Sequence, residues 1–417
     1  MTVADKTPRV EKKILPNGLT IYHEYDNSVE GVFIGAVIHA GSKHEQKPGV
    51  AHFLEHVVMT QKIPGFDTGL HGIEKRFGYK NMWFDDAYTD RLGTVYSFCA
   101  SPSFSEFPVF LETFRDVLFH MPIDGDIEAE RQTVCSEINL TDYDFVNKSE
   151  KMMYRELFPG TWIEKNPFNL GRVSDVAEIT VDDLNAFKNT HYTPQNTSIF
   201  IFGNLQTEYV ESVFSRVQME KPSCLVTSVE PLVYTPYVRE EIFYYDEETQ
   251  QASDDQGLVD IAWAVPDLGE KHNLTYGFMG ELLSRTALHH PLRDDRRLYG
   301  TSVGFRWLGE VGLFTLRVQD NIPFGEEDVV RLIHLLSSRK VLDEYVEPVE
   351  RLFSPTYMQL RFSPKERMNV RVRQLVDTGT CYSIEEYCER LQSVSKDEVY
   401  EIIAKYITPS SCTIFMC

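Results

Sequence analysis

The chain has 417 residues, of which 42% are hydrophobic and 25% charged, and its formal net charge is −22. This length predicts two domains, and the composition is typical of a globular protein. The excess of acidic residues argues against nucleic acid and against an anionic membrane surface as partners, because both attract basic surfaces. The same charge favours basic peptides as ligands.

No run of apolar residues approaches the roughly 18 that span a bilayer, and the N-terminal residues lack the apolar core of a signal peptide. The seven cysteines include no C-x-x-C pair, which is typical of reduced thiols. We therefore expect a cytoplasmic protein without a membrane-spanning segment.

In the first half of the chain, strands and helices are expected to alternate. Residues 10–15 and 19–22 flank an Asn-Gly turn and predict a β-hairpin, and residues 32–38 predict a buried strand. Further strands are predicted at 87–89, 94–100 and 198–202, and helices at 49–58, 104–121, 126–158 and 181–190.

The second half repeats the end of the first. Residues 183–192 and 397–406 lie about half the chain apart, and each segment ends in Tyr and is followed by Pro and an apolar strand. We infer an α+β fold of two tandem homologous domains, each a mainly antiparallel sheet covered by helices on one face. The predicted limits are 1–216 and 238–417, joined by a proline-containing linker at 217–237. Other elements predicted in the second domain are strands at 260–265 and 311–318 and helices at 274–288 and 326–345.

One predicted helix carries His52-Phe-Leu-Glu55-His56, an H-x-x-E-H pattern. Four residues apart on a helix, His52 and His56 lie on one face and can bind the same divalent ion, with Glu55 beside them. Two histidines, one carboxylate and an open position form a common catalytic zinc site, and this pattern occurs in zinc peptidases. The alternative without function is a structural helix that carries these residues by chance.

A carboxylate on the predicted 126–158 helix is the best candidate for a further ligand. Glu130 and Glu137 are seven residues apart, so they share one face of that helix. The other histidines are poorer candidates because they precede the motif, lie in a glycine-rich loop or belong to the second domain.

Six segments occur in the order expected for one peptidase family. They are Leu15-Pro-Asn-Gly-Leu19, Ala40-Gly-Ser42, Gly49-Val-Ala-His-Phe-Leu-Glu-His56, Ala87-Tyr-Thr89, Thr94-Val-Tyr96 and Glu130-Arg-Gln-Thr-Val-Cys-Ser-Glu137. With them, the chain resembles zinc metallopeptidases of the pitrilysin or insulinase type, and most of all the short-chain members that include mitochondrial processing peptidase and its bacterial relatives.

The resemblance implies that Glu137 is the third zinc ligand and that Glu130 is a supporting acid behind it. It also implies that Asp86, Ala87 and Thr89 contact substrate. Asp stands at position 86 where the family generally has Asn, and an ionised Asp accepts hydrogen bonds but donates none.

The second domain of such peptidases contributes an Arg and a Tyr to the active site. The segment Leu292-Arg293-Asp-Asp-Arg-Arg-Leu298-Tyr299 matches the Arg position, whereas Tyr299 comes one residue early. A shift of one residue in a strand reverses the face to which a side chain points.

The predicted function is that of a zinc-dependent endopeptidase that hydrolyses unfolded or extended peptides and holds one Zn²⁺ per chain. Glu55 is expected to act as general base, and Arg293, with Tyr299, to stabilise the oxyanion. The strand at 94–99 is expected to accept an extended peptide as an added strand.

The resemblance also implies assembly, because longer family members enclose substrate between two halves of this size. A clamshell homodimer, or a heterodimer with a related subunit, is expected. The alternative function is that of a non-catalytic scaffold or partner subunit in a peptidase-like heterodimer.

Overall fold

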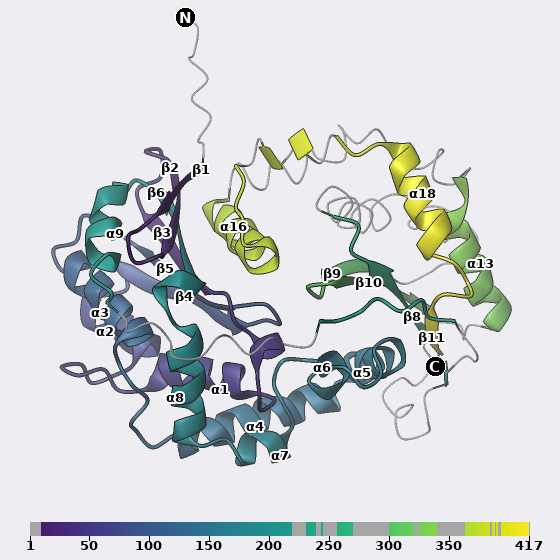
Figure 1. Cartoon of the computed structure of the whole chain (residues 1–417), viewed down its shortest axis with the longest axis horizontal. Helices are drawn as coiled ribbons and strands as arrows, with labels where there is room; N and C mark the ends of the chain where they lie inside the picture. The colour runs from purple at the N-terminus through teal and green to yellow at the C-terminus, as the bar shows by residue number, and fades with distance from the viewer. Residues whose placement is uncertain are drawn as a thin grey trace, which may run out of the picture. The chain divides into compact units, whose positions relative to one another are not determined.

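The structure is a computed structural model (Figure 1). It describes residues 10–218, 231–238, 243–244, 257–269, 300–320, 325–339, 363–383, 386–387, 389–390 and 393–416. The chain forms two compact units. The first contains residues 1–141, 165–229 and 359–385, and the second contains residues 142–164, 230–358 and 386–417.

The first unit is built on a six-stranded sheet. In sheet order its strands are β1 (Val10–Ile14), β2 (Thr20–Tyr25), β6 (Thr197–Gly203), β3 (Val32–Ile38), β5 (Thr94–Ala100) and β4 (Met82–Thr89). Strands β2 and β6 run parallel, and all other neighbours in this sheet run antiparallel. Among the described strands β4 pairs with β5 alone, so β4 forms an edge of the sheet.

One face of this sheet packs against most helices of the first unit. These elements are α1 (Val50–Thr60), α2 (Ile73–Phe77), α3 (Phe107–Phe119), α4 (Glu128–Tyr143), α7 (Val173–Ala177), α8 (Val181–His191) and α9 (Thr207–Phe214), with short 3₁₀ turns at Ser42–His44, Leu70–Gly72 and Pro194–Asn196. Successive side chains along each strand point to opposite faces of the sheet. Ile21 and Ile34 therefore join the core under these helices, whereas Tyr22 and Val37 point to the opposite face.

The opposite face is covered by α16 (Pro364–Thr378), a helix from the second half of the chain. Met368, Val372 and Leu375 of α16 are buried on this face. Gly35 of β3 permits the close approach, because a Cβ atom there would lie 2.9 Å from a methyl group of Val372. Helices therefore cover both faces, which corrects the prediction of one covered face.

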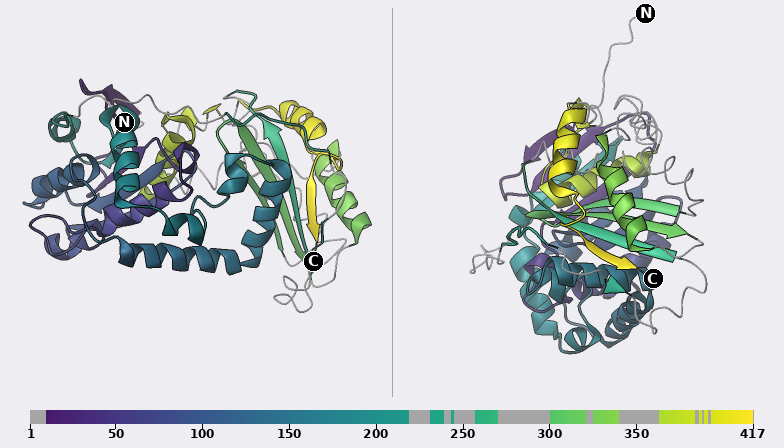
Figure 2. Two further views of the ribbon diagram at one scale, coloured as in Figure 1. Left: turned by 60° about the horizontal axis from the view of Figure 1, so that its bottom comes forward. Right: turned by 90° about the vertical axis from the view of Figure 1, so that its right-hand side faces the viewer.

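The sheet of the second unit has five strands. In sheet order they are β7 (Phe243–Tyr244), β11 (Thr413–Met416), β8 (Gly257–Pro266), β10 (Val311–Asp320) and β9 (Gly300–Trp307). Two helices, α13 (Glu326–Ser337) and α18 (Lys396–Tyr406), share the core on one face. The helix α5 (Phe145–Leu157), followed by the short α6 (Trp162–Lys165), packs on the other face (Figure 2).

The two sheets share one topology, which confirms the predicted repeat and the α+β fold class. The order β2-β6-β3-β5-β4 corresponds to β7-β11-β8-β10-β9, and in each sheet the first of these pairs is parallel and the rest antiparallel. The strands β6 and β11 each follow a helix, α8 or α18, that begins with a capping box.

The predicted limits of several elements differ from those observed. The single helix predicted at 126–158 is two helices, because Asp144 adopts an extended conformation and caps α5 by accepting a hydrogen bond from the amide of Asn147. The units are also not two contiguous stretches of chain, since α5 belongs to the second unit and α16 to the first. The predicted helix at 274–288 lies outside the described residues.

No helix within the described ranges is long and apolar enough to cross a bilayer. The predicted helix at 326–345 is observed as far as Ser337, and residues from 340 onward lie outside the description.

A buried ion-pair network fastens α16 to the first sheet. The guanidinium of Arg371 is fully buried, and its Nε atom lies 3.2 Å from Oε2 of Glu24 on β2. Arg367, one turn earlier, lies 3.6 Å from the same Glu24 carboxylate and 3.1 Å from that of Asp26. Glu24 is 1% exposed, so its charge is compensated by these arginines rather than by water.

Replacing Glu24 should therefore destabilise the fold. We expect Glu24→Gln to lower the free energy of unfolding by about 3 kcal/mol, because it leaves a buried cation uncompensated. Chemical denaturation measures the change. Glu11→Gln on the exposed strand β1 is the matched control and should change stability by less than about 0.5 kcal/mol. Equal effects of the two substitutions would contradict the assignment.

Candidate metal centre

The first turn of α1 is held by a close backbone approach and by a side-chain cap. Gly49 precedes the helix at φ 88°, a conformation that favours glycine, and a Cβ atom there would lie 2.5 Å from the carbonyl oxygen of Leu170. The carboxylate of Glu45 accepts hydrogen bonds from the amides of Gly49 and Ala51, each at 2.9 Å, and from the side chain of Asn166 at 3.0 Å. Glu45 thus caps the helix that carries the H-x-x-E-H residues.

Three candidate ligands, two from α1 and one from α4, converge. Figure 1 labels the two helices. The Nε2 atoms of His52 and His56 lie 3.6 and 3.3 Å from Oε2 of Glu137. One potential ligand atom from each residue lies within 4.8 Å of the other two. Within the described ranges this is the one group of three such side chains that could hold a metal ion.

These distances fit a zinc ion. Zinc bonds nitrogen and oxygen at about 2.0–2.2 Å in a tetrahedron, which places neighbouring ligand atoms about 3.3–3.6 Å apart. The two distances to Glu137 lie in that range. The Nδ1 atom of His52 is buried with no hydrogen-bond partner, and its ring lies 4.6 Å from that of His56.

The pKa values of the two histidines are shifted in opposite directions. Burial lowers the pKa of His52 to about 4, helped by the neighbouring His56. The pKa of His56 is raised instead. Burial alone would lower it, but the hydrogen bond with Glu137 and the negative charges of Glu55, Glu137 and Glu130 have the larger effect. His52 is therefore neutral at pH 7, as a metal ligand must be.

Glu130 lies behind His56 rather than in the ligand set. Its Oε2 atom is 3.5 Å from Nδ1 of His56, whose Nε2 atom faces Glu137. A carboxylate on the second ring nitrogen fixes the orientation of a ligating histidine and raises its basicity. This position suits the supporting role predicted for Glu130.

Glu55 stands beside the ligands and faces the edge strand. Its Oε2 atom accepts a hydrogen bond from the hydroxyl of Thr89 on β4 at 3.2 Å. Burial is the main cause that raises the pKa of Glu55 to about 7 before any cation is bound, although His56 and Thr89 act in the opposite direction. A carboxyl group with such a pKa can both take and return a proton near neutrality.

The other predicted residues separate into two groups. Ala87 packs against the core on the α1 side of the sheet, the side on which Thr89 meets Glu55, whereas Asp86 lines a groove with α16 on the opposite side. Arg293 and Tyr299 lie outside the described residues, so their roles stay predictions.

The prediction that the strand at 94–99 accepts a peptide is wrong. Strand β5 pairs with β3 on one side and with β4 on the other, so its backbone groups are already used. Next to β5 the strand with a free edge, among the described residues, is β4.

The family can be assigned from comparisons with known proteins. Residues 20–165 match the model of the insulinase family, peptidase family M16, and residues 178–336 match that of the peptidase M16 inactive domain. The chain belongs to the M16 peptidase family.

Individual relatives agree with this assignment. The chain is 23% identical to "Mitochondrial-processing peptidase subunit beta" of Saccharomyces cerevisiae over 95% of its own length and 88% of that protein. It is 25% identical to "Uncharacterized zinc protease YmxG" of Bacillus subtilis over 49% of each chain. A solved protease from Helicobacter pylori has the same fold, with a TM-score of 0.78 at 18% identity over 98% of this chain and 99% of that one.

Sequence reasoning missed the residues that position α1. An acid four residues before Gly49 was visible in the sequence and is the type of residue that caps a helix N-terminus. Its partner Asn166, however, is 121 residues away from Glu45, and no local pattern joins the two.

Substitutions on α4 should distinguish the zinc ligand Glu137 from the supporting residue Glu130. We expect Glu137→Gln to weaken zinc binding more than about 100-fold, and Glu130→Gln about 10- to 100-fold, because outer-shell carboxylates contribute that much. Competition with a chromophoric chelator measures both. The control Glu128→Gln, on the same helix and paired with Arg131 instead, should leave the affinity within about twofold. Equal affinities of all variants would refute this ligand set.

Glu45 should act on the site through the helix. We expect Glu45→Ala to cost about 1–2 kcal/mol of stability, because the amides at the start of α1 lose their acceptor. Zinc affinity should fall with it, and Glu45→Gln should restore only part of both, because one of the two accepting oxygens becomes an amide group that donates. Denaturation and chelator competition test this, and a Glu45→Ala variant with unchanged stability would contradict the capping role.

Proposed function

We propose that this M16 family protein is a zinc-dependent endopeptidase acting on unfolded or extended peptides. The observation that carries the proposal is the convergence of His52, His56 and Glu137 directly beside Glu55, which is itself hydrogen-bonded to the edge strand through Thr89. A relative named as a zinc protease supports the choice of metal.

The residues of the first unit have distinct roles in the proposed reaction. His52, His56 and Glu137 would hold one Zn²⁺, which when bound polarises a carbonyl group and makes a water molecule more acidic. Glu55, which is not a ligand, takes a proton from the attacking water and passes it to the nitrogen of the leaving amine. Arg293, with Tyr299, is proposed to stabilise the oxyanion from the second half of the chain.

The edge strand β4 is the proposed binding place for substrate. Its free edge offers backbone N–H and C=O groups, and an extended peptide can satisfy them by adding a strand. Because the hydroxyl of Thr89 meets Glu55, a peptide along β4 runs beside the general base. Folded proteins cannot offer an extended segment in this way, which favours unfolded substrates.

Assembly from two chains is part of the proposal. A relative is by name one subunit, and we propose a clamshell homodimer or a heterodimer with a related subunit. Cytoplasmic residence, expected from the cysteines, stays a prediction.

The alternative is a scaffold without catalysis. The inactive-domain match covers residues 178–336, which include none of the zinc-site residues on α1 and α4. We therefore favour the peptidase, and one experiment decides between the two.

Glu55→Gln should abolish cleavage while keeping the metal. We expect kcat on unfolded peptides to fall by about 10²- to 10⁴-fold, because the amide cannot accept the proton, with zinc content unchanged. Glu137→Gln, the companion variant, should lose both zinc and activity. Cleavage by Glu55→Gln at the wild-type rate would exclude the proposed base, and a zinc-loaded wild type that cleaves no unfolded peptide would favour the scaffold.

A further inference from the structure

A groove runs along the edge strand on the side that faces away from Glu55. Its volume is about 380 Å³, many times the roughly 30 Å³ that one water molecule takes. Val95, Met368 and Val372 supply apolar lining, whereas Asp86 and Tyr88 of β4 and Arg373 of α16 supply polar groups. No part of the proposed reaction uses this groove.

An irregularity in β4 places the carboxylate of Asp86 on the groove side of the sheet. A register shift between Phe84 and Asp86 inserts Asp85 as an extra residue, and such a bulge interrupts the alternation of side chains. The carboxylate of Asp85 lies 3.1 Å from the ammonium group of Lys365 on α16. Asp86 also points to the α16 side, and of these two successive acids it is Asp86 that lines the groove.

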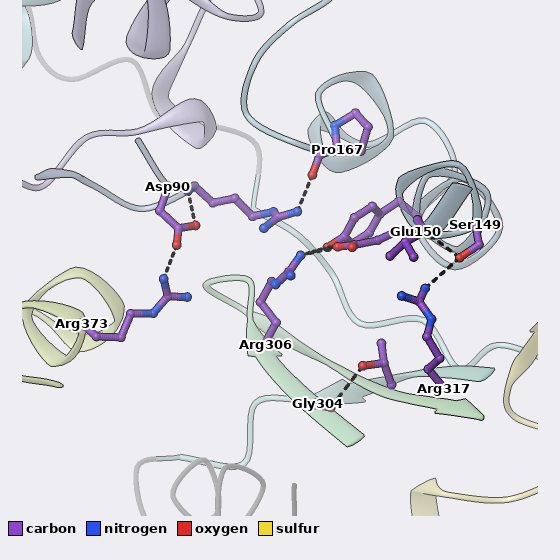
Figure 3. Close-up of polar contacts among 12 residues, drawn as sticks. Asp90, Ser149, Glu150, Pro167, Gly304, Arg306, Arg317 and Arg373 are labelled. Carbon is purple, nitrogen blue, oxygen red and sulfur yellow. Dashed lines mark hydrogen bonds and ion pairs between the residues drawn. The ribbon is translucent and has the colours of Figure 1, made fainter. Parts of the chain in front are cut away.

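The nearby cations already have partners. Lys365 pairs with Asp85, and Arg373 of α16 pairs with Asp377, at 3.1 Å, and with Asp90 (Figure 3). Among the residues that the structure describes, no lysine or arginine makes an ion pair with Asp86. Asp86 is exposed and lines the groove, and although the charge of Lys365 acts on its carboxylate from a distance, no ion pair occupies it.

The geometry of an added strand directs substrate side chains into this groove. In a peptide paired with β4, the residues opposite Asp86 and Tyr88 point to the same face as these side chains, at Cβ distances of about 5 Å. The residue opposite Thr89 points to the other face, toward Glu55. Substrate side chains therefore enter the groove and the catalytic side alternately.

We propose that the groove between β4 and α16 is a specificity subsite for a lysine or arginine side chain of the peptide, selected by Asp86. The apolar lining accommodates the aliphatic stem, and the carboxylate meets the charged end. Asp86 and Thr89 are three residues apart on β4. In the bound peptide, the basic residue opposite Asp86 is therefore three positions from the residue opposite Thr89. This inference rests on the proposed function, and it gives Asp86 a side-chain role in place of a backbone contact.

Peptide binding tests the subsite without requiring turnover. Zinc-loaded Glu55→Gln protein is titrated with fluorescent extended peptides that carry Lys, norleucine or Glu at each position in turn, and anisotropy gives the affinity. At one position we expect Lys to bind about fivefold more tightly than Glu, as suits a partly exposed ion pair. High salt should reduce that ratio.

Charge reversal at Asp86 supplies the decisive comparison. In a protein that also carries Asp86→Lys, the preference at that position should invert in favour of Glu. The matched control Glu366→Gln removes an exposed acid of α16 that does not line the groove, and it should keep the preference for Lys.

The outcomes separate the two proposals. A Lys-to-Glu ratio that is unchanged by Asp86→Lys at every position overturns the subsite and leaves the peptidase proposal intact. If no peptide binds under any condition, both proposals fail.

Discussion

The position of α1 is the constraint on which the candidate site depends. Its first turn is capped by Glu45 and lies against the loop that carries Leu170, and Glu55 in its middle meets Thr89 of the edge strand. With the helix axis fixed at one end, the four-residue spacing places His52 and His56 side by side. The ligands and the base are thus held by one rigid helix rather than by loops, which is the arrangement that keeps a catalytic geometry accurate.

On one face, each sheet is covered by a helix from the other half of the chain: α16 covers the first sheet and α5 the second. This arrangement has a functional consequence. In the first unit, α16 buries apolar side chains and the Glu24 network under one face of the sheet. The same helix forms one wall of the groove beside β4. A helix that stabilises the fold therefore also shapes the surface along which a peptide is proposed to lie.

Much of this architecture followed from the sequence because it depends on local patterns. The spacing of His52, Glu55 and His56, and the shared face of Glu130 and Glu137, are properties of single helices. The repeated Tyr-Pro-strand segments likewise predicted the duplicated topology. The break at residue 144 has a local cause, the Asp144 cap, which sequence reasoning missed. The sheet order that makes β4 the edge and the covering of both faces arise instead from contacts between distant segments, which no local pattern encodes.

The most direct test of the account is the identity of the ligands at bound zinc. X-ray absorption at the zinc edge, combined with anomalous diffraction from crystals of the zinc-loaded protein, identifies the donor atoms and places the ion. The account predicts one ion bonded to two imidazole nitrogens, of His52 and His56, and to an oxygen of Glu137, at about 2.0–2.2 Å. An ion bound elsewhere, or with a sulfur atom among its ligands, would contradict it.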